Sequence, residues 1–577
     1  MKRKLFSLLL AFALISALIP SYAQPGGQPI GQPGGQPAEH RGGGLKAPEQ
    51  AMLRPVYSQA LSTLPPQHNH IVTNLRWQTP VKNQRNTDLC WTFAAMAAIE
   101  SSTLKNTGRS VILSEVHAGH SLSSDSGNLL GFDRTANQGG WATLNAPYLM
   151  RGSLRGLVDN SDDALSALSI SARDLSITAG KPVSFTVPNA YRLSMRNNNK
   201  STNMQVIKNA VVDYGAVAAR MLITPEFNSN TNPNNAYYCA PSRVPALESQ
   251  GMGHFVAIVG WDDTYPRNNF LSSFRPPNDG AWLIKNSWGT DWGIGGYAWI
   301  SYDDAVIDTE CYAFCPAEDF DPDKKIYEYD PFGFTWGSTW GRFAANIFTA
   351  DKPGETLTEV KFFTNDTANT KKIYYVPLNG NGTNLSISGL APIAEINTPS
   401  EGYYTVKIPE ENRVKVTERF AVVIDFGGSV WLPMSFNYSR AEGFAQNYSS
   451  QYIHTPNVSF FSMDSIGSQW YEPQTGNKKP ANMCIKAVTG GNDNGGEPPD
   501  ETPEITPPDE NFTSVSVDGD ATATTNLDVG SSITLTDGYT ATISSLDDLT
   551  VVIKVDKNPP QDSVKAFLSA LLAFLAA

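Results

Sequence analysis

A cysteine, a histidine and an asparagine each stand at one end of a strongly apolar segment, and this feature constrains the fold more than any other in the chain. Cys90 opens an apolar run that begins Cys-Trp-Thr-Phe-Ala-Ala. His254 opens a run rich in β-branched residues, and Asn286 ends the apolar run 281–285. The first run predicts a helix, and the other two predict buried strands, because short continuous apolar runs are typical of strands covered on both faces.

Cys90 is a candidate nucleophile. A thiol in the first turn of a helix feels the positive end of the helix dipole, so we expect its pKa to lie below that of a free thiol. A nucleophile of this kind needs a base, and the base needs a group that holds its ring. His254 and Asn286 are the candidates for these roles, and Gln84 is the candidate donor to an oxyanion. Taken singly, structural packing and turn formation are the commoner explanations of such residues.

Several separated blocks together resemble the papain family of cysteine peptidases, over about residues 66 to 318. In chain order these blocks are residues 79–84, 90–91, 113–115 and 138–140, His254, and residues 285–293. The resemblance implies an α+β, two-lobed catalytic domain that cleaves polypeptides through a thioester acyl-enzyme. It makes Cys90 the nucleophile, His254 the acid/base, Asn286 the residue that orients the imidazole and Gln84 the oxyanion donor.

The same resemblance implies residues that contact the substrate. Trp288 would cover the histidine–asparagine hydrogen bond and exclude water from it. Gly139 and Gly140 would form a wall that an extended substrate backbone can approach. Arg220 would reach a specificity pocket and favour acidic side chains there, although an arginine at a strand end more often faces solvent. No cofactor is expected, and His117 and His120 lack the companion ligands that a metal site needs.

The chain also departs from the family pattern. Residues 87–89 replace the usual Cys-Gly-Ser before the nucleophile, and Asp88 would raise the pKa of the thiol if it points inward. Gly253 stands where an acidic residue is common. Polar insertions lengthen the intervals between the blocks, and we expect them to be surface loops: residues 195–203, 227–235 and 262–280.

The four cysteines other than Cys90 permit three pairings in a secreted chain. Cys311 lies where the family carries a cysteine, and Cys239 is its expected partner. Cys315 and Cys484 would then tie the following domain to the catalytic domain.

The two ends of the chain have the composition of processing and linker segments. Residues 1–23 read as a signal peptide cleaved near Ala23, so the protein is expected to be secreted, periplasmic or on the cell surface. Residues 24–65 are a low-complexity leader or short propeptide. Three segments follow the second domain: a Pro/Gly/acidic linker at 489–511, a small β-module at 512–557 and an apolar tail at 558–577, too short to span a membrane.

Residues 326–488 contain short β-rich runs separated by turns, which predict an antiparallel β-sandwich. Around residues 329–336 the region resembles the lectin-like domain that follows papain-type domains in some secreted bacterial proteins. It is a candidate domain for a glycan or another cell-surface ligand. Five aromatic residues could stack on sugars, with core packing as the commoner alternative: Trp336, Trp340, Trp431, Trp470 and Tyr471.

The sequence thus predicts a secreted, monomeric cysteine endopeptidase with an appended lectin-like domain. The net charge of −13 argues against nucleic acid as a partner. Two other classes stay open. The first is a catalytically inactive papain-like adhesin or glycan-binding protein. The second is a thiol transpeptidase or self-processing enzyme, in which an amine and not water accepts the acyl group.

Overall fold

The computed structural model describes most of the residues between Ile71 and Gly490, together with three strands near the C-terminus. The described ranges are 71–124, 130–141, 145–150, 157–158, 183–193, 200–335, 337–380, 382–437, 454–475, 478–490, 532–534, 540–547 and 550–555. The expected signal peptide, leader and apolar tail lie outside these ranges, as do Trp336 and nearly all of the linker.

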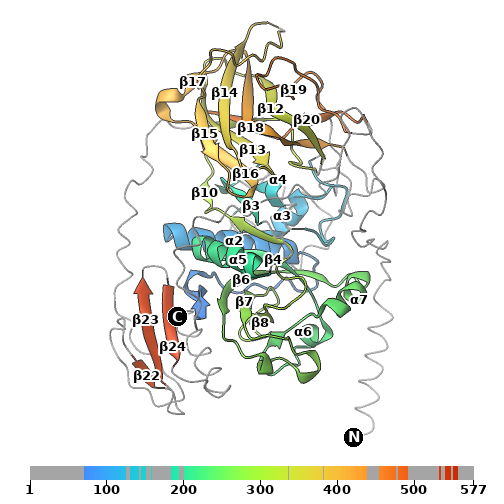
Figure 1. Ribbon diagram of the computed structural model, residues 1–577, viewed down its shortest axis with the longest axis vertical. Helices are drawn as coiled ribbons and strands as arrows, with labels where there is room; N and C mark the ends of the chain where they lie inside the picture. Colours follow the sequence, from blue (N-terminus) through green and yellow to red (C-terminus); the bar gives the residue numbers. More distant parts are fainter. Residues whose placement is uncertain are drawn as a thin grey trace.

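The catalytic region is α+β (Figure 1). Its helices are α2 (Cys90–Thr107), α3 (Glu115–Ser121), α4 (Asn145–Met150), α5 (Lys200–Tyr214), α6 (Pro225–Ser229) and α7 (Val244–Ser249). Its strands are β1 (Ile71–Thr73), β2 (Phe185–Thr186), β3 (Ala190–Leu193), β4 (Val217–Leu222), β5 (Ala236–Tyr237), β6 (Gly253–Asp262), β7 (Ala281–Lys285), β8 (Tyr297–Ser301), β9 (Cys311–Phe314) and β10 (Glu318–Asp319).

The second region is all-β and lies at the top of Figure 1. Its strands are β11 (Lys324–Glu328), β12 (Gly337–Thr349), β13 (Thr356–Thr364), β14 (Thr370–Leu378), β15 (Ala394–Asn397), β16 (Glu401–Lys407), β17 (Val414–Lys415), β18 (Arg419–Phe436), β19 (Ser459–Ser462), β20 (Ala481–Met483) and β21 (Ile485–Gly490). A separate antiparallel sheet near the C-terminus contains β22 (Ser532–Thr534), β23 (Thr540–Asp547) and β24 (Thr550–Val555). The predicted fold class, an α+β catalytic domain followed by an antiparallel sandwich, is confirmed.

One sheet of 13 strands runs through both regions, in the order β11-β21-β13-β16-β3-β9-β4-β6-β7-β8-β5. Two further strands of this sheet lie off that path: β1 pairs with β6, and β17 pairs with β13. The two regions join where β16 pairs antiparallel with β3, so that Glu401 lies opposite Arg192 and Tyr403 opposite Ala190. The Arg192 guanidinium contacts the Glu401 carboxylate at 3.3 Å. Main-chain pairing and this ion pair therefore fix the sandwich to the catalytic region.

The sandwich core lies between this sheet and a second sheet, ordered β15-β14-β18-β12-β19 with β20 paired to β18. Alternate residues of facing strands fill it, as expected when two sheets pack face to face; among them are Val360, Phe362, Ile373, Val422 and Ile424.

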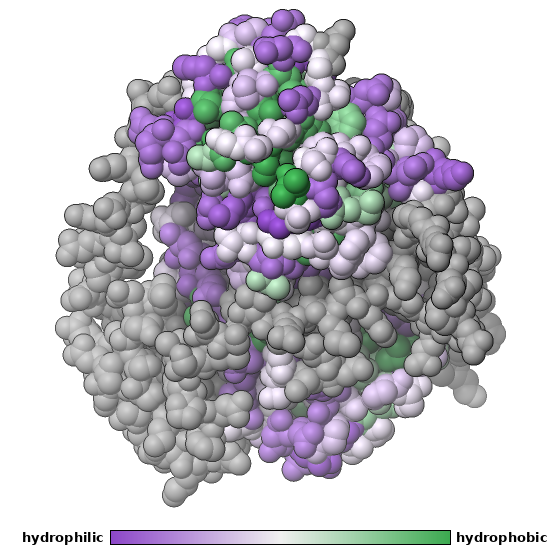
Figure 2. All heavy atoms as spheres, turned by 45° about the horizontal axis from the view of Figure 1, so that its top comes forward, coloured by the Kyte–Doolittle hydropathy of each residue, from purple (hydrophilic) through white to green (hydrophobic). Residues whose placement is uncertain are grey.

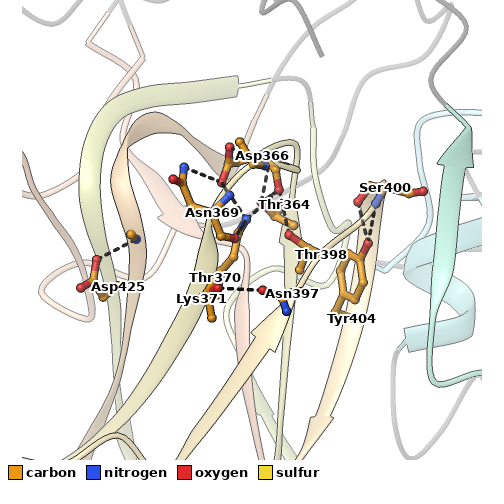
Figure 3. A network of polar contacts seen from close by, with 12 residues as sticks. Thr364, Asp366, Asn369, Thr370, Lys371, Asn397, Thr398, Ser400, Tyr404 and Asp425 are labelled. Carbon is orange, nitrogen blue, oxygen red and sulfur yellow. Dashed lines mark hydrogen bonds and ion pairs between the residues drawn. The ribbon is translucent and has the colours of Figure 1, made fainter. Parts of the chain in front are cut away.

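Polar groups at one end of the sandwich are held by a buried lysine (Figure 3). Lys371 is fully buried, and its ammonium donates to the Asp366 carboxylate at 2.7 Å and to the Asn369 carbonyl at 2.6 Å. Burial lowers the pKa of Lys371, while Asp366 acts in the opposite direction. Thr398 Oγ1 donates to the Asp366 carbonyl at 2.8 Å. The loop between β13 and β14 is thus ordered by internal hydrogen bonds, beside the strand that joins the two regions.

The expected disulfides are wrong, because all five cysteines are free thiols. Cys239 packs with Leu222, Leu247 and Val306 in a small satellite cluster, whereas Cys311 belongs to the large core shared with the sandwich. Cys484 lies in a third cluster, and Cys315 contacts Asn189 and Tyr191. The expected partners therefore fill different cores.

Candidate active site

The imidazole of His254 is held by Asn286. His254 is the second residue of β6 and is 2% exposed, and Asn286 directly follows β7, a neighbour of β6 in the sheet. His254 Nε2 lies 2.8 Å from Asn286 Oδ1. The same oxygen accepts the Ser287 backbone N–H at 2.8 Å, which identifies it as an acceptor. The His254 Nε2 atom must then carry the proton, so the lone pair is assigned to Nδ1.

Cys90 is the first residue of α2, at the end where unpaired N–H groups concentrate. The backbone N–H groups of Phe255, Trp91 and Cys90 itself act to lower the pKa of its thiol, and Cys90 lies in the same core cluster as Phe255. Phe255 follows His254 directly, so the structure brings the nucleophile candidate to the beginning of β6. The α2 helix is buried on nearly all sides, so its apolar residues are not confined to one face.

The expected low pKa of the thiol is wrong. The pKa of Cys90 is raised to about 12, mainly by burial and also by the charge of Asp88, while the three backbone N–H groups act in the opposite direction. Burial also lowers the pKa of His254 to about 4, against the effect of the Asn286 hydrogen bond. Desolvation therefore outweighs the helix dipole and favours the uncharged form of each group.

Gln84 is anchored so that one side-chain N–H stays available. Its Oε1 accepts from Ser287 Oγ at 2.5 Å, and its Nε2 donates to the Thr87 carbonyl at 2.7 Å. Its backbone N–H donates to the Ser287 carbonyl at 2.7 Å. An amide nitrogen carries two protons, so the second can serve another acceptor. Ser287, which directly follows Asn286, thus positions the Gln84 side chain.

Aromatic rings cover the histidine. The Trp288 ring centroid lies 5.1 Å from that of His254, and the Phe227 centroid lies 6.1 Å from it. Phe227 is fully buried in α6, with Trp292 at 4.6 Å. The prediction of a surface loop at 227–235 is therefore wrong for residues 227–229, which form the end of α6. The N-cap signal Thr224-Pro225-Glu226 could have revealed this helix, since Thr224 Oγ1 accepts the Phe227 N–H.

A buried charge cluster that the sequence reading did not identify lies behind the site. Lys82 Nζ contacts Glu100 and Glu115, each at 2.6 Å, and Lys285 Nζ donates to the Thr79 carbonyl at 2.6 Å. Burial disfavours the Lys82 ammonium, but the two carboxylates outweigh it and raise the pKa of Lys82. The cluster joins α2, the segment before Gln84 and the strand before Asn286, so it sets the spacing of all three.

The two glycines of the expected wall have different surroundings. A Cβ on Gly140 would lie 2.6 Å from Cε2 of the Trp91 indole, whereas a Cβ on Gly139 would meet nothing closer than Asp88 Cβ at 3.9 Å. Gly140 is therefore required by packing inside the protein. Gly139 borders open space, where a ligand could approach.

This difference gives a testable pair of variants. We expect Gly140→Ala to destabilise the protein by about 1–3 kcal/mol, because the indole must move. We expect Gly139→Ala to leave stability within about 0.5 kcal/mol while it raises the KM for extended peptides. Thermal unfolding and steady-state kinetics of both variants check this. Equal stability losses would contradict it.

Arg220 lies in β4 and is largely buried. Its Nη2 atom contacts the Glu248 carboxylate at 2.6 Å, and its guanidinium carbon lies 5.2 Å from the centre of the Trp141 ring. In the sheet, its neighbour Met221 is opposite His254. The arginine is thus close to the site, but its charge is already paired.

No helix among the residues that the structure describes is long and apolar enough to cross a membrane. In the same residues, no three or more His, Cys, Asp or Glu side chains are grouped in a way that could hold a metal ion.

The chain matches two family profiles. Residues 69–316 match the papain family cysteine proteases, and residues 326–489 match the lectin-like domain. Cathepsin L2 of Homo sapiens is 26% identical over 226 residues, which are 39% of this chain and 58% of that protein. Cathepsin J of Mus musculus is 28% identical over 260 residues, 42% of this chain and 66% of that protein. The chain thus spans less than two thirds of the length of these relatives.

A solved structure shares the fold of both regions. It contains the cysteine protease and lectin-like domains of Cwp84, a surface layer associated protein of Clostridium difficile. The TM-score is 0.59 at 24% identity, with 73% of this chain and 91% of that chain covered. Residues 69–316 therefore belong to the papain family of cysteine proteases, and residues 326–489 form a lectin-like domain.

Proposed function

We propose that the protein is a secreted cysteine endopeptidase that hydrolyses peptide bonds through a thioester at Cys90. The observation that carries the proposal is the fixed His254–Asn286 pair, with its unprotonated nitrogen assigned to Nδ1, next to Phe255, which lies in the same core cluster as Cys90. A binding protein has no need for an oriented imidazole beside a buried thiol. An inactive adhesin is therefore the less favoured alternative.

Because burial favours the uncharged form of both groups, the chemistry begins with a proton transfer from the thiol to the imidazole. As the Cys90 sulfur attacks the substrate carbonyl carbon, its proton passes to His254 Nδ1. The carbonyl oxygen becomes an oxyanion, which the free Nε2–H of Gln84 and the Cys90 backbone N–H stabilise. His254 then protonates the departing amine. Water, activated by the same nitrogen, cleaves the thioester and releases the acid.

The reaction is tested by the mass of its products. The purified chain, residues 24–577, is incubated with a denatured protein substrate in the presence and absence of a primary amine such as hydroxylamine or glycine amide. Free carboxyl termini in both conditions support hydrolysis. Products that carry the amine in preference to water would instead make the protein a transpeptidase. Absence of any cleavage, together with no labelling of Cys90 by an epoxide-type thiol inhibitor, would refute the peptidase and favour the catalytically inactive adhesin.

We further propose that Arg220 contributes to a pocket near the scissile bond. Its pairing with Glu248 argues against the strong acidic preference expected from the residue alone, since the carboxylate neutralises it. Glu248→Gln should release the positive charge and raise kcat/KM for peptides with an acidic side chain in this pocket by about two- to fivefold, the scale of one exposed charge pair. Profiling with a peptide library checks this. An unchanged profile in Glu248→Gln would place Arg220 outside the pocket.

The lectin-like domain is the candidate for binding a cell-surface glycan. Trp340 is 48% exposed, and its ring lies 5.3 Å from that of Trp431, its cross-strand partner. Tyr471 is 43% exposed. Figure 2 shows hydrophobic residues among hydrophilic ones on the sandwich end of the molecule. Trp470 is not a candidate platform, because its Nε1 donates to the Gly467 carbonyl and its ring packs near Phe343.

A glycan array with the Cys90→Ala chain, followed by titration of any ligand found, tests this site. Trp340→Ala should weaken binding by about tenfold, because an exposed indole offers the largest stacking surface. Leu390→Ala removes an exposed aliphatic side chain of the same domain and should leave affinity unchanged. Binding that survives Trp340→Ala at full strength would contradict the assignment. Absence of any glycan ligand would make the domain a structural module.

A protein of this kind would act outside the cell or on its surface. The leading segment 1–23 supports this, and Cwp84, with which the fold is shared, is described as surface layer associated. Fractionation of the producing cells checks the location.

A further inference from the structure

A turn from the lectin-like domain inserts a phenylalanine into the core of the catalytic domain. The turn has the sequence Asp330-Pro331-Phe332-Gly333, and the Gly333 N–H donates to the Asp330 carbonyl at 2.8 Å. Aspartate first, proline second and glycine last are the preferences of a type I turn. Phe332 is 2% exposed and belongs to the core cluster that contains Trp91, Leu122 and Phe132. We call the turn 330–333 the plug.

The lectin-like domain holds the plug on both sides. Before it, the Tyr329 ring stacks on Phe348 at 5.3 Å, and Tyr329 OH donates to the Ile347 carbonyl at 2.8 Å. After it, the Phe334 ring stacks on Phe363 at 4.5 Å. Within the plug, Lys486 Nζ donates to the Asp330 carboxylate at 2.8 Å. The position of Phe332 is therefore set by the sandwich.

Inside the catalytic domain, Phe332 supports the segment that leads to the substrate wall. Its ring meets the edge of Phe132 at a centroid distance of 5.1 Å. The Phe132 carbonyl accepts the Arg134 N–H at 2.7 Å. The Arg134 guanidinium lies over the Trp91 ring at 4.6 Å, and its Nη2 contacts the Gly139 carbonyl at 3.5 Å. A continuous path of packed groups thus runs from the lectin-like domain to the residue after Cys90 and to the open glycine.

We propose that Phe332 is a positioning residue for peptide substrates, which holds the 132–139 segment at the distance from Cys90 that an extended substrate requires. The inference rests on the proposed peptidase function. The lectin-like domain is then part of the catalytic apparatus in addition to any ligand that it binds. A shift of about 1 Å in a positioning segment can cost roughly 100-fold in rate. The cavity that Phe332→Ala leaves beside Phe132 should therefore lower the rate of peptide cleavage.

The test uses the full chain and three readings. Two fluorogenic amides with the same residue at the scissile bond are compared, one with a single residue and one with four residues before that bond. The third reading is the rate at which iodoacetamide alkylates Cys90, because this small reagent has no need of the wall. For Phe332→Ala we expect kcat/KM for the four-residue substrate to fall 10- to 100-fold, mainly through KM. We expect the single-residue substrate and the alkylation rate to change less than threefold.

Two further variants keep the test sharp. Phe332→Leu refills most of the space and should restore the four-residue kcat/KM to within about fivefold of the wild type; it also serves if Phe332→Ala does not fold. Phe343→Ala empties a similar volume in the outer core of the sandwich, away from the plug. It should leave the KM of both substrates unchanged.

Each result decides one of two questions. Equal losses on all three readings in Phe332→Ala, or an unchanged KM for the long substrate in both Phe332 variants, would overturn the positioning role. A KM increase in Phe343→Ala equal to that in Phe332→Ala would reduce the effect to general destabilisation and would also overturn it. A wild-type chain that cleaves neither substrate would refute the peptidase function itself.

Discussion

Replacement of Cys90 by alanine is expected to abolish peptide hydrolysis, with a loss of roughly a million-fold in kcat, the scale seen when a catalytic nucleophile is removed. Among the five thiols, Cys90 is the one that stands in the first turn of a helix. The fold should survive, because alanine fits the first turn of α2 and only a sulfur atom is lost. Turnover of a fluorogenic peptide and far-UV circular dichroism measure the two effects.

A matched control for this variant is Cys239→Ala. Cys239 is 1% exposed and lies in a satellite cluster with Leu247 and Val306, whereas Cys90 lies in a different core cluster. Its replacement should leave kcat and KM unchanged and should not prevent labelling of the protein by an epoxide-type thiol inhibitor. Hydrolysis that persists in Cys90→Ala at more than about a thousandth of the wild-type rate would refute the nucleophile assignment.

Replacement of Glu100 by alanine should give the largest loss of stability, about 3–5 kcal/mol. Glu100 is 1% exposed and accepts from Lys82, from Thr79 and from the Leu113 N–H. Alanine would leave the hydroxyl and the N–H buried without an acceptor and would leave Lys82 with one carboxylate in place of two. Thermal unfolding should show a midpoint lower by roughly 10 °C.

Two comparisons separate charge from packing in this result. Glu100→Gln keeps acceptors for Thr79 and the Leu113 N–H but removes the charge, so its stability should lie between those of the wild type and Glu100→Ala. Glu411→Ala removes an exposed carboxylate and should change stability by less than about 0.5 kcal/mol. A loss of under 1 kcal/mol in Glu100→Ala would show that the cluster does not hold the three elements together.

Local sequence signals predicted the elements that carry the site, because each candidate residue stands at an end of an apolar run. Cys90 begins a helix, His254 is the second residue of a strand and Asn286 follows a strand, close to the expected ends. The order of the blocks then indicated that these ends meet. The roles of the residues stay proposals, which the variants above test.

The features that sequence reasoning missed depend on contacts between distant segments or on burial. Phe227 stands in an asparagine-rich stretch, so composition indicated a loop although its ring packs near His254. The pKa of Cys90 was predicted from the helix dipole alone, whereas complete burial dominates. The Asp330–Gly333 turn is readable from its residues, but nothing local indicates which core receives Phe332.

The pairing of β3 with β16 has a consequence for how the protein would act on a surface. Because the backbones of the two domains are hydrogen-bonded into a single sheet, the sandwich does not rotate freely relative to the catalytic domain. Whatever the sandwich adheres to sets the direction in which the cleft faces. Cleavage would then be selected by the angle and height at which a polypeptide stands relative to that support, as well as by its sequence.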